Sequence, residues 1–172
     1  TSSHLGLQIQ TPYYFALQPW RDATFAPIFT GREGTVLTGN YRERTQTGHV
    51  QVETSITRPK ERQGARRTGG RDLRGHARAT GNFVLSPSWK WGFDTARSSD
   101  DTYLRRYGFS SENTLVSNAF LEGIDGRNYA AVNAWAFQGL REDDDPGTTP
   151  LVVPMIDYTL VAGPGAKGQT VT

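Results

Sequence analysis

The chain of 172 residues is 35% hydrophobic and 11% aromatic, so it can build a domain with a sizeable core and is too rich in aromatic residues for a disordered chain. Its net charge of +2 predicts no strong general attraction to nucleic acid or to an acidic membrane surface. The absence of cysteine excludes disulfides and thiolate metal sites within this sequence.

The N-terminal region predicts two extended segments, each associated with a proline. Apolar and polar residues alternate from Leu5 to Gln10, up to Pro12, and an aromatic cluster follows. An extended pattern resumes over Asp22–Phe29 and carries Pro27 inside it. Proline cannot donate a ladder hydrogen bond, so both prolines are expected at a sheet edge or at a break in pairing.

Residues 35–44 and 49–57 predict two antiparallel strands joined by a short turn. Each strand alternates between apolar and polar side chains, which is typical of a sheet with one dry and one wet face. In the first strand, the apolar face carries Leu37 and Tyr41, and the opposite face carries Arg42 and Arg44.

The clearest strand pattern lies in residues 73–85. Every odd position there is small or apolar, and the even positions as far as Asn82 are polar. A period of two over a dozen residues excludes a helix, which would distribute the arginines around its axis. The polar face is basic, with Arg74, His76 and Arg78. Such a face is expected to line a water-filled lumen or to meet open solvent.

The second half of the chain continues in the same way. A strand that follows the Ser86–Ser88 turn presents Trp89, Trp91 and Phe93 on one face. Residues 114–124 and 129–140 predict a hairpin around an Asp-Gly turn, and residues 151–161 predict a last strand. The pattern therefore predicts roughly eight or nine strands and no helix.

The connections alternate between tight turns and long charged loops, the latter at residues 58–71, 95–112 and 141–150. Outer-membrane barrels combine tight periplasmic turns with larger outer loops, and their strands have about 9–11 residues. Aromatic residues on the dry face are typical of a membrane interface. The predicted fold class is thus all-β, an antiparallel up-and-down meander that forms part of a transmembrane β-barrel.

Short sequence motifs in the order expected of one family occur along nearly the whole chain. They are Pro12-Tyr13-Tyr14-Phe15, Asp22 to Pro27, Arg32-Glu33-Gly34, Trp91 to Asp94, Asp101 to Leu104, Phe137 to Leu140 and Pro154 to Tyr158. Together they resemble the start of the barrel in the LptD family, the lipopolysaccharide-assembly proteins of the Gram-negative outer membrane.

The resemblance implies that residues 1–172 are the first strands of one barrel domain, with a periplasmic jellyroll before them and more strands after them. In that family, lipopolysaccharide leaves sideways through a lateral gate between the first and last strands. Pro12 and Pro27 match the prolines that weaken this gate. The implied partners are lipopolysaccharide, an LptE-like lipoprotein plug, an LptA-like periplasmic bridge reached through the jellyroll, and the outer membrane, with no nucleic acid. Family members that carry disulfides differ here, because this chain has no cysteine.

Two interpretations of the apolar face stay open. In a barrel, the residues Leu37, Tyr41, Trp89, Trp91 and Phe93 face lipid; in a soluble β-sandwich that binds carbohydrate or glycolipid, they pack against a second sheet. The basic residues Arg42, Arg44, Arg74, His76 and Arg78 line the lumen in a barrel, where they meet phosphorylated glycolipid or the plug. Otherwise they belong to an ordinary solvated sheet face.

A sugar-active enzyme is a third interpretation. It needs two carboxylates roughly 5 to 10 Å apart, and the candidates are Asp94, Asp101, Glu122 and Asp157. No metalloprotease or serine-hydrolase motif occurs, and the three histidines form no metal-spaced pair, so no catalytic residue, metal site or cofactor is predicted. The basic segment 58–71 lacks interleaved aromatics for nucleic acid and predicts a solvated loop.

Overall fold

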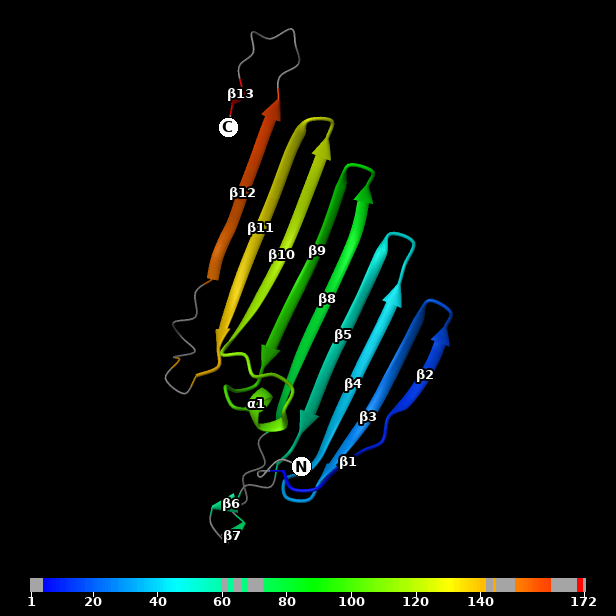
Figure 1. The fold of residues 1–172 in the computed structure, drawn as a ribbon, viewed down its shortest axis with the longest axis vertical. Helices are drawn as coiled ribbons and strands as arrows, with labels where there is room; N and C mark the ends of the chain where they lie inside the picture. Colours follow the sequence, from blue (N-terminus) through cyan, green and yellow to red (C-terminus); the bar gives the residue numbers. More distant parts are fainter. Residues whose placement is uncertain are drawn as a thin grey trace.

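One antiparallel sheet makes up nearly all of the structure, a computed structural model that describes residues 5–59, 62–63, 66–67, 73–141, 144, 151–161 and 170–171. Eleven strands of the described residues form this sheet (Figure 1). They are β1 (Gln8–Gln10), β2 (Tyr13–Gln18), β3 (Arg21–Thr30), β4 (Gly34–Arg44), β5 (Gly48–Thr57), β8 (Arg74–Ser86), β9 (Trp89–Ser98), β10 (Thr114–Asp125), β11 (Asn128–Gly139), β12 (Leu151–Val161) and β13 (Thr170–Val171).

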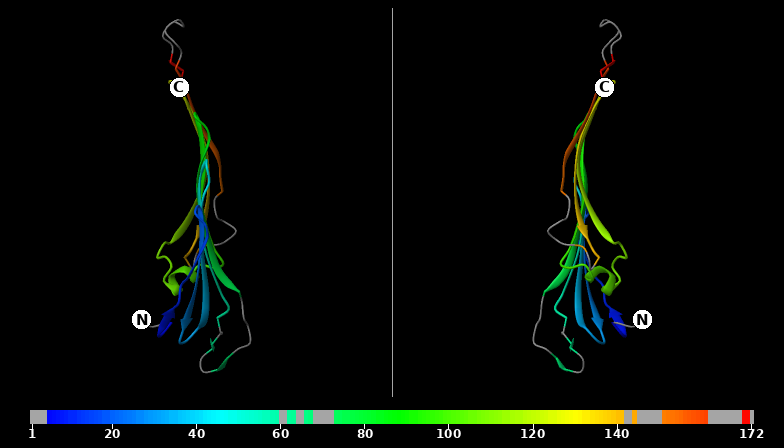
Figure 2. Two further views of the ribbon diagram at one scale, coloured as in Figure 1. Left: turned by 90° about the vertical axis from the view of Figure 1, so that its right-hand side faces the viewer. Right: turned by 90° about the vertical axis from the view of Figure 1, so that its left-hand side faces the viewer.

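The strand order confirms an up-and-down meander. From β3 to β13 each strand pairs with the next strand of the sheet in an antiparallel register, in the order β3-β4-β5-β8-β9-β10-β11-β12-β13. The short strands β6 (Arg62–Gln63) and β7 (Arg66–Arg67) form a separate hairpin inside the predicted basic loop. The sheet is open in the described residues, with β1 and β2 on one edge and β13 on the other. Viewed edge-on, it is a thin twisted layer (Figure 2).

Two local features differ from the sequence expectation. The aromatic residues after Pro12 form strand β2, which the pattern did not predict because apolar side chains occupy both faces there. A five-residue helix, α1 (Tyr103–Tyr107), lies in the connection predicted to be all loop. The sequence pattern does not indicate this helix, because a single helical turn is too short to show a period of 3.6 residues. The helix ends at Gly108, whose φ of 74° is left-handed.

The register places all five predicted lipid-facing residues on one face of the sheet, here called the apolar face. Tyr41 lies opposite Val52, and Val52 lies opposite Ala79. Gly81 follows Ala79 by two residues and so shares its face, and Phe93 lies opposite Gly81. Leu37, Trp89 and Trp91 are 38–40% exposed. No second sheet covers this face in the part of the chain that the structure describes. The packing that a β-sandwich requires is therefore not found there.

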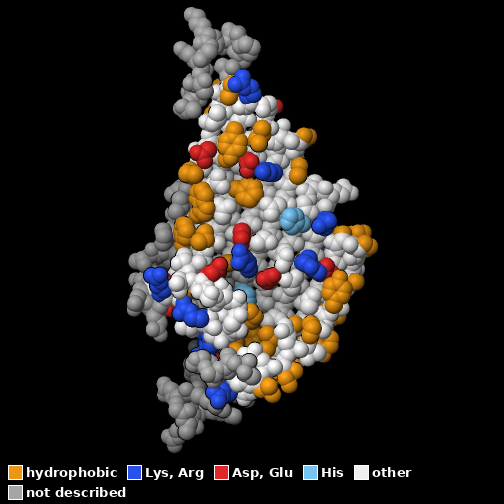
Figure 3. Space-filling model, viewed as in Figure 1, with side chains coloured by type: hydrophobic (Ala, Val, Ile, Leu, Met, Phe, Trp, Pro, Cys, Tyr) orange, Lys and Arg blue, Asp and Glu red, His pale blue; other side chains and the backbone are white. Residues whose placement is uncertain are grey.

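The opposite face, here called the polar face, carries the predicted basic residues. Arg42 shares a rung with Gln51, Thr80 and Asp94, and Arg78 shares the next polar rung with Glu53 and Asn40. Figure 3 shows charged side chains of both signs interspersed over the middle of this face. Helix α1 also lies on it, because Tyr103 contacts Ser55 and His76. Arg44, Arg74 and His76 complete the basic set by the same alternation.

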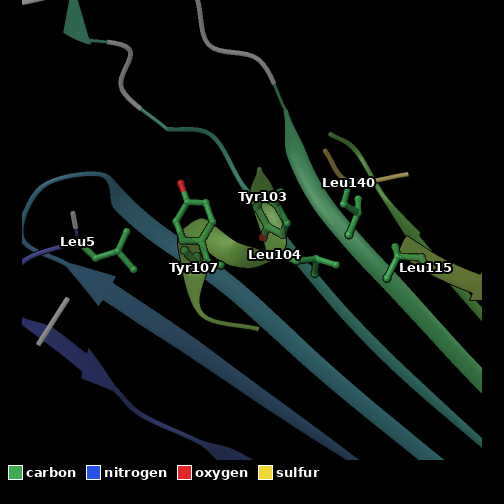
Figure 4. Close-up of a cluster of buried hydrophobic side chains, with 7 residues drawn as sticks. Leu5, Tyr103, Leu104, Tyr107, Leu115 and Leu140 are labelled. Carbon is green, nitrogen blue, oxygen red and sulfur yellow. The ribbon is translucent and has the colours of Figure 1, made fainter. Parts of the chain in front are cut away.

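The buried core is small and lies under α1 at one end of the polar face. It contains Leu5, Val36, Tyr103, Leu104, Tyr107, Leu115 and Leu140 (Figure 4). The sheet itself has no large core, so its stability depends mainly on the hydrogen-bond ladder and on side-chain pairs across neighbouring strands. Among the described residues, no helix has the length and apolar character needed to cross a membrane.

Aromatic rings cover glycines on neighbouring strands. Gly92 lies directly opposite Phe120, and a Cβ added at Gly92 would lie 2.7 Å from the Phe120 ring and 2.6 Å from the carbonyl oxygen of Gly81. The backbone oxygen cannot move aside without disturbing the ladder, so this position requires glycine. Such ring-over-glycine pairs are a known device for stabilising glycine-containing strands.

Replacement of Gly92 by alanine is expected to lower the free energy of unfolding by about 2 kcal/mol, because the new methyl group overpacks against backbone and ring. Urea unfolding followed by tryptophan fluorescence measures the change. Gly39→Ala is the matched control, since its Cβ would meet only the Thr54 methyl at 3.4 Å. Equal stability of the two variants would contradict the close approach at Gly92.

Candidate functional site at the N-terminal edge

The first edge of the sheet is one strand with an interruption. In β1, Gln10 pairs with Ile28, and in β2, Tyr13 pairs with Phe25. Both pairings belong to a single register, so Thr11 and Pro12 lie opposite Pro27 and Ala26. The two predicted gate prolines therefore lie on adjacent rungs between the edge strand and β3. The structure thus brings Pro12 and Pro27 together.

Pro27 removes a hydrogen bond from the inner side of this edge. The amide of Gly31 donates to the Leu7 carbonyl at 2.9 Å, and the amide of Thr11 donates to the Pro27 carbonyl at 3.2 Å. Such pairs normally exchange two bonds, but Pro27 has no N–H to return to Thr11. The side of β3 that faces β4 loses nothing, because the even-numbered residues of β3 bond to β4.

Pro12 removes a donor from the outer side of the same edge. Residues 7, 9 and 11 direct their backbone groups toward β3, so the even-numbered residue Pro12 directs its own toward the free edge. An added strand would find no donor at this position. The two prolines therefore weaken neighbouring rungs on both sides of one strand.

The edge strand also has little side-chain packing. Every residue from Leu7 to Trp20 is exposed, although many of them are large and apolar. Tyr13 and Phe15 lie on the apolar face, whereas Tyr14, opposite Thr24, lies on the polar face. Apolar rings therefore flank the edge on both sides. Long exposed edges are normally blunted, and this one is interrupted by proline rather than covered.

The β9–β10 connection, residues 99–113, packs on the polar face against β5, β8 and the β3–β4 turn. Asp100 accepts hydrogen bonds from Arg74 at 2.8 Å and from the amide and hydroxyl of Thr102, the residue just before α1. Burial alone would raise the pKa of Asp100, but hydrogen bonds from Arg74, Ser99 and Thr102 hold that pKa well below its usual range. Asp100 is therefore a fixed negative charge that joins β8 to the helix.

Two further contacts fix α1 to the sheet. The Tyr103 and Ser55 hydroxyls are 2.6 Å apart, and the Ser55 hydroxyl is also 2.6 Å from Nδ1 of His76. The guanidinium of Arg106 pairs with the buried carboxylate of Glu33 in the β3–β4 turn. Burial raises the pKa of the Tyr107 phenol beside Glu33, so this hydroxyl stays protonated. The helix thus connects β5 and β8 to the β3–β4 turn.

The middle of the polar face is balanced in charge. Arg42 pairs with Asp22 and Arg78 pairs with Asp94, each at 3.0 Å. Glu53 accepts hydrogen bonds from Asn40 and Gln51, and a shallow hollow of about 290 Å³ lies between Gln51, Glu53, Arg78 and Thr80. The predicted basic residues are therefore partly neutralised, which the one-strand pattern could not show because each acid lies on a neighbouring strand.

Two of the four candidate carboxylates of a sugar-active enzyme, Asp94 and Glu122, lie too far apart for that role. Asp94 pairs with Arg78, and Glu122 pairs with Lys90. Lys90 lies directly opposite Glu122 and four residues from Asp94 along β9, so the backbone positions of the two acidic residues are offset by roughly 13 Å along the strands. That exceeds the separation glycosidases use. The described residues contain no group of three potential metal ligands.

Comparison with known proteins gives consistent results along the chain. The family model of LPS transport system D, LptD, matches residues 72–171. The LPS-assembly protein LptD of Nitrosococcus oceani is 28% identical over 147 residues, which cover 84% of this chain and 19% of the relative. That of Aromatoleum aromaticum is 30% identical over 145 residues, or 81% of this chain and 16% of the relative. The chain thus spans less than a fifth of the length of these curated relatives.

Replacing Asp100 by asparagine is expected to lower the free energy of unfolding by about 2 kcal/mol at pH 7, because Arg74 loses its charged partner. A carboxyl with a depressed pKa stabilises the fold above its unfolded pKa, and that contribution is lost as pH falls through the folded pKa. The difference between wild type and variant should therefore shrink below about pH 4. Thermal unfolding at several pH values measures it, with Asp101→Asn as the control. A difference that is independent of pH down to pH 2 would contradict the assignment.

Proposed function

Because the chain belongs to the LptD family, we propose that it forms the first strands of an outer-membrane translocon that inserts lipopolysaccharide into the outer leaflet of a Gram-negative bacterium. The N-terminal edge is the proposed lateral gate. One observation carries this proposal: Pro12 and Pro27 occupy adjacent rungs and weaken both sides of one edge strand. A seam with missing donors opens at lower cost than a continuous ladder.

Gating of this kind is passive. The seam separates, acyl chains pass between the first strand and the closing strand, and the ladder re-forms behind them. Exposed rings on both sides of the edge, including Tyr13 and Tyr14, offer apolar contacts along that path. We propose no bond-making or bond-breaking step for this chain. The energy for transport would come from the machinery that delivers the glycolipid.

The two faces then meet different media. The apolar face, with Leu37, Trp89 and Trp91 substantially exposed, is proposed to contact lipid, which removes the cost of exposing these side chains to water. The polar face is proposed to line the lumen, where a plug lipoprotein and glycolipid phosphates would meet a surface of paired charges. A periplasmic jellyroll joined to the bridge protein is proposed to precede residues 1–172.

Restoring the ladder is expected to impair export. In the full-length protein, Pro12→Val and Pro27→Val together supply two N–H donors and a strand-forming side chain, so the seam should open less readily. Surface lipopolysaccharide should fall several-fold, as measured by labelling of intact cells. Pro19→Val, in the exposed β2–β3 turn of the same hairpin, is the matched control and should leave export unchanged. Normal export in the double variant would refute the gate.

Fluorescence quenching tests the proposed lipid face. The full-length protein is reconstituted in vesicles of brominated lipid, with Trp91 as the sole tryptophan. Its emission should be strongly quenched, because bromine in the acyl chains would contact the indole. The control is Phe120→Trp in a background whose other tryptophans are replaced by phenylalanine. Residue 120 pairs with Gly92, the neighbour of Trp91, so it lies at nearly the same level of the sheet but on the polar face. Equal quenching at both positions would contradict the assignment of faces.

A further inference from the structure

Strand β1 is held in place by very few contacts. It pairs with β3 over three residues, and Thr11 and Pro12 separate it from β2. Within the described segment 5–20, Leu5 is the one buried side chain, with 2% of its surface exposed, whereas Leu7 is 67% exposed. Among the described contacts, those that attach this segment to the sheet are a short ladder and the burial of the Leu5 side chain.

Leu5 reaches its site by leaving the path of the strand. Strand alternation from Leu7 and Ile9 would place Leu5 on the apolar face. Gly6 adopts a φ of 72°, which a residue with a side chain rarely adopts, and this turn directs Leu5 to the polar face. There Leu5 joins the cluster that contains Val36 and Tyr107, and its side chain extends toward Tyr107 (Figure 4).

The other half of this contact is rigid and does not depend on β1. Arg74 holds Asp100 at the start of the β9–β10 connection, Ser55 holds Tyr103, and Glu33 holds Arg106. These contacts reach β8, β5 and the β3–β4 turn. Helix α1 would therefore keep its position if Leu5 withdrew. Figure 2 shows α1 and the N-terminal end of the chain on the same side of the sheet.

We propose that the β9–β10 connection, residues 99–113, acts as a latch. It keeps β1 paired with β3 for as long as the Leu5 side chain is packed against Tyr107. This inference rests on the proposed gate and adds its regulation. When Leu5 leaves the cluster, β1 swings about Thr11 and Pro12 and uncovers the backbone of β3 from Pro27 to Gly31. The β2–β3 hairpin stays paired, so the edge opens first at the end that carries α1.

Hydrogen exchange measured by mass spectrometry tests the latch in the full-length protein folded in detergent micelles. Leu5→Ala is expected to raise the exchange rates of the Ile9 and Thr11 amides, followed in peptides covering residues 8–11, about tenfold, because these two amides are protected by β3 only while β1 is paired with it. Peptides from β2 and from β5 should exchange as in wild type. Leu7→Ala, an equal truncation at the exposed neighbouring leucine, should change nothing.

A second variant truncates Tyr107, against which Leu5 packs, instead of Leu5 itself. Tyr107→Ala is expected to release β1 to the same extent, and the double variant with Leu5→Ala should release it no further, since both changes break one contact. Unchanged exchange in β1 in Leu5→Ala would overturn the latch. Faster exchange in β5 as well would also overturn it, because Leu5 would then support the whole sheet.

The same variants separate the latch from the gate. If Leu5→Ala releases β1 while the two proline replacements leave surface lipopolysaccharide unchanged, the latch stands and the proposed gate fails. If the proline replacements block export while β1 exchanges normally in Leu5→Ala and in Tyr107→Ala, the gate stands and the latch fails. Exchange and export are therefore independent readouts of the two proposals.

Discussion

The continuous antiparallel ladder from β3 to β12 is the constraint on which the rest of the structure depends. A one-layer sheet buries little apolar surface, so its strands are held mainly by backbone hydrogen bonds and by pairs of side chains across neighbouring strands. Every residue on the sheet is thereby committed to one of two faces. The same alternation that places Trp91 on the apolar face places Arg78 on the polar face, and a slip of one residue would exchange them.

At the N-terminal edge, the hydrogen-bond ladder is incomplete because two residues lack an N–H donor. A proline is harmless to a sheet only where its missing donor has no partner to satisfy. The N–H group that Pro27 lacks would point toward the edge strand, and the one that Pro12 lacks would point toward the free edge. The interior of the sheet keeps its bonds while the first strand loses some of its own. Weakness is thus confined to one strand, as the proposed lateral gate requires.

Side chains on the polar face offset part of this weakness at one end. The ion pairs of Arg74 with Asp100 and of Arg106 with Glu33 join strands and turns that are far apart in the sequence. They fix α1 over the start of the sheet, where Leu5 is buried. Among the described residues, no comparable ion pair fixes Pro12 or β2 to the rest of the sheet. The edge strand therefore has a braced end and an unbraced end.

The all-β class, the main strands and the two faces follow from the residue pattern, because a period of two is a local property that a strand with one dry and one wet face displays. The sequence also indicated that Pro12 and Pro27 belong at an edge, since the lack of an N–H is a property of the residue. It missed β2, whose residues Tyr13 to Leu17 do not alternate, and α1, which is a single turn. The folded chain was needed to show that the two prolines lie on neighbouring rungs, that Asp22 and Asp94 pair with arginines, and that Leu5 lies under α1. Those relations depend on strand register and on contacts between distant segments, which no pattern along one strand contains.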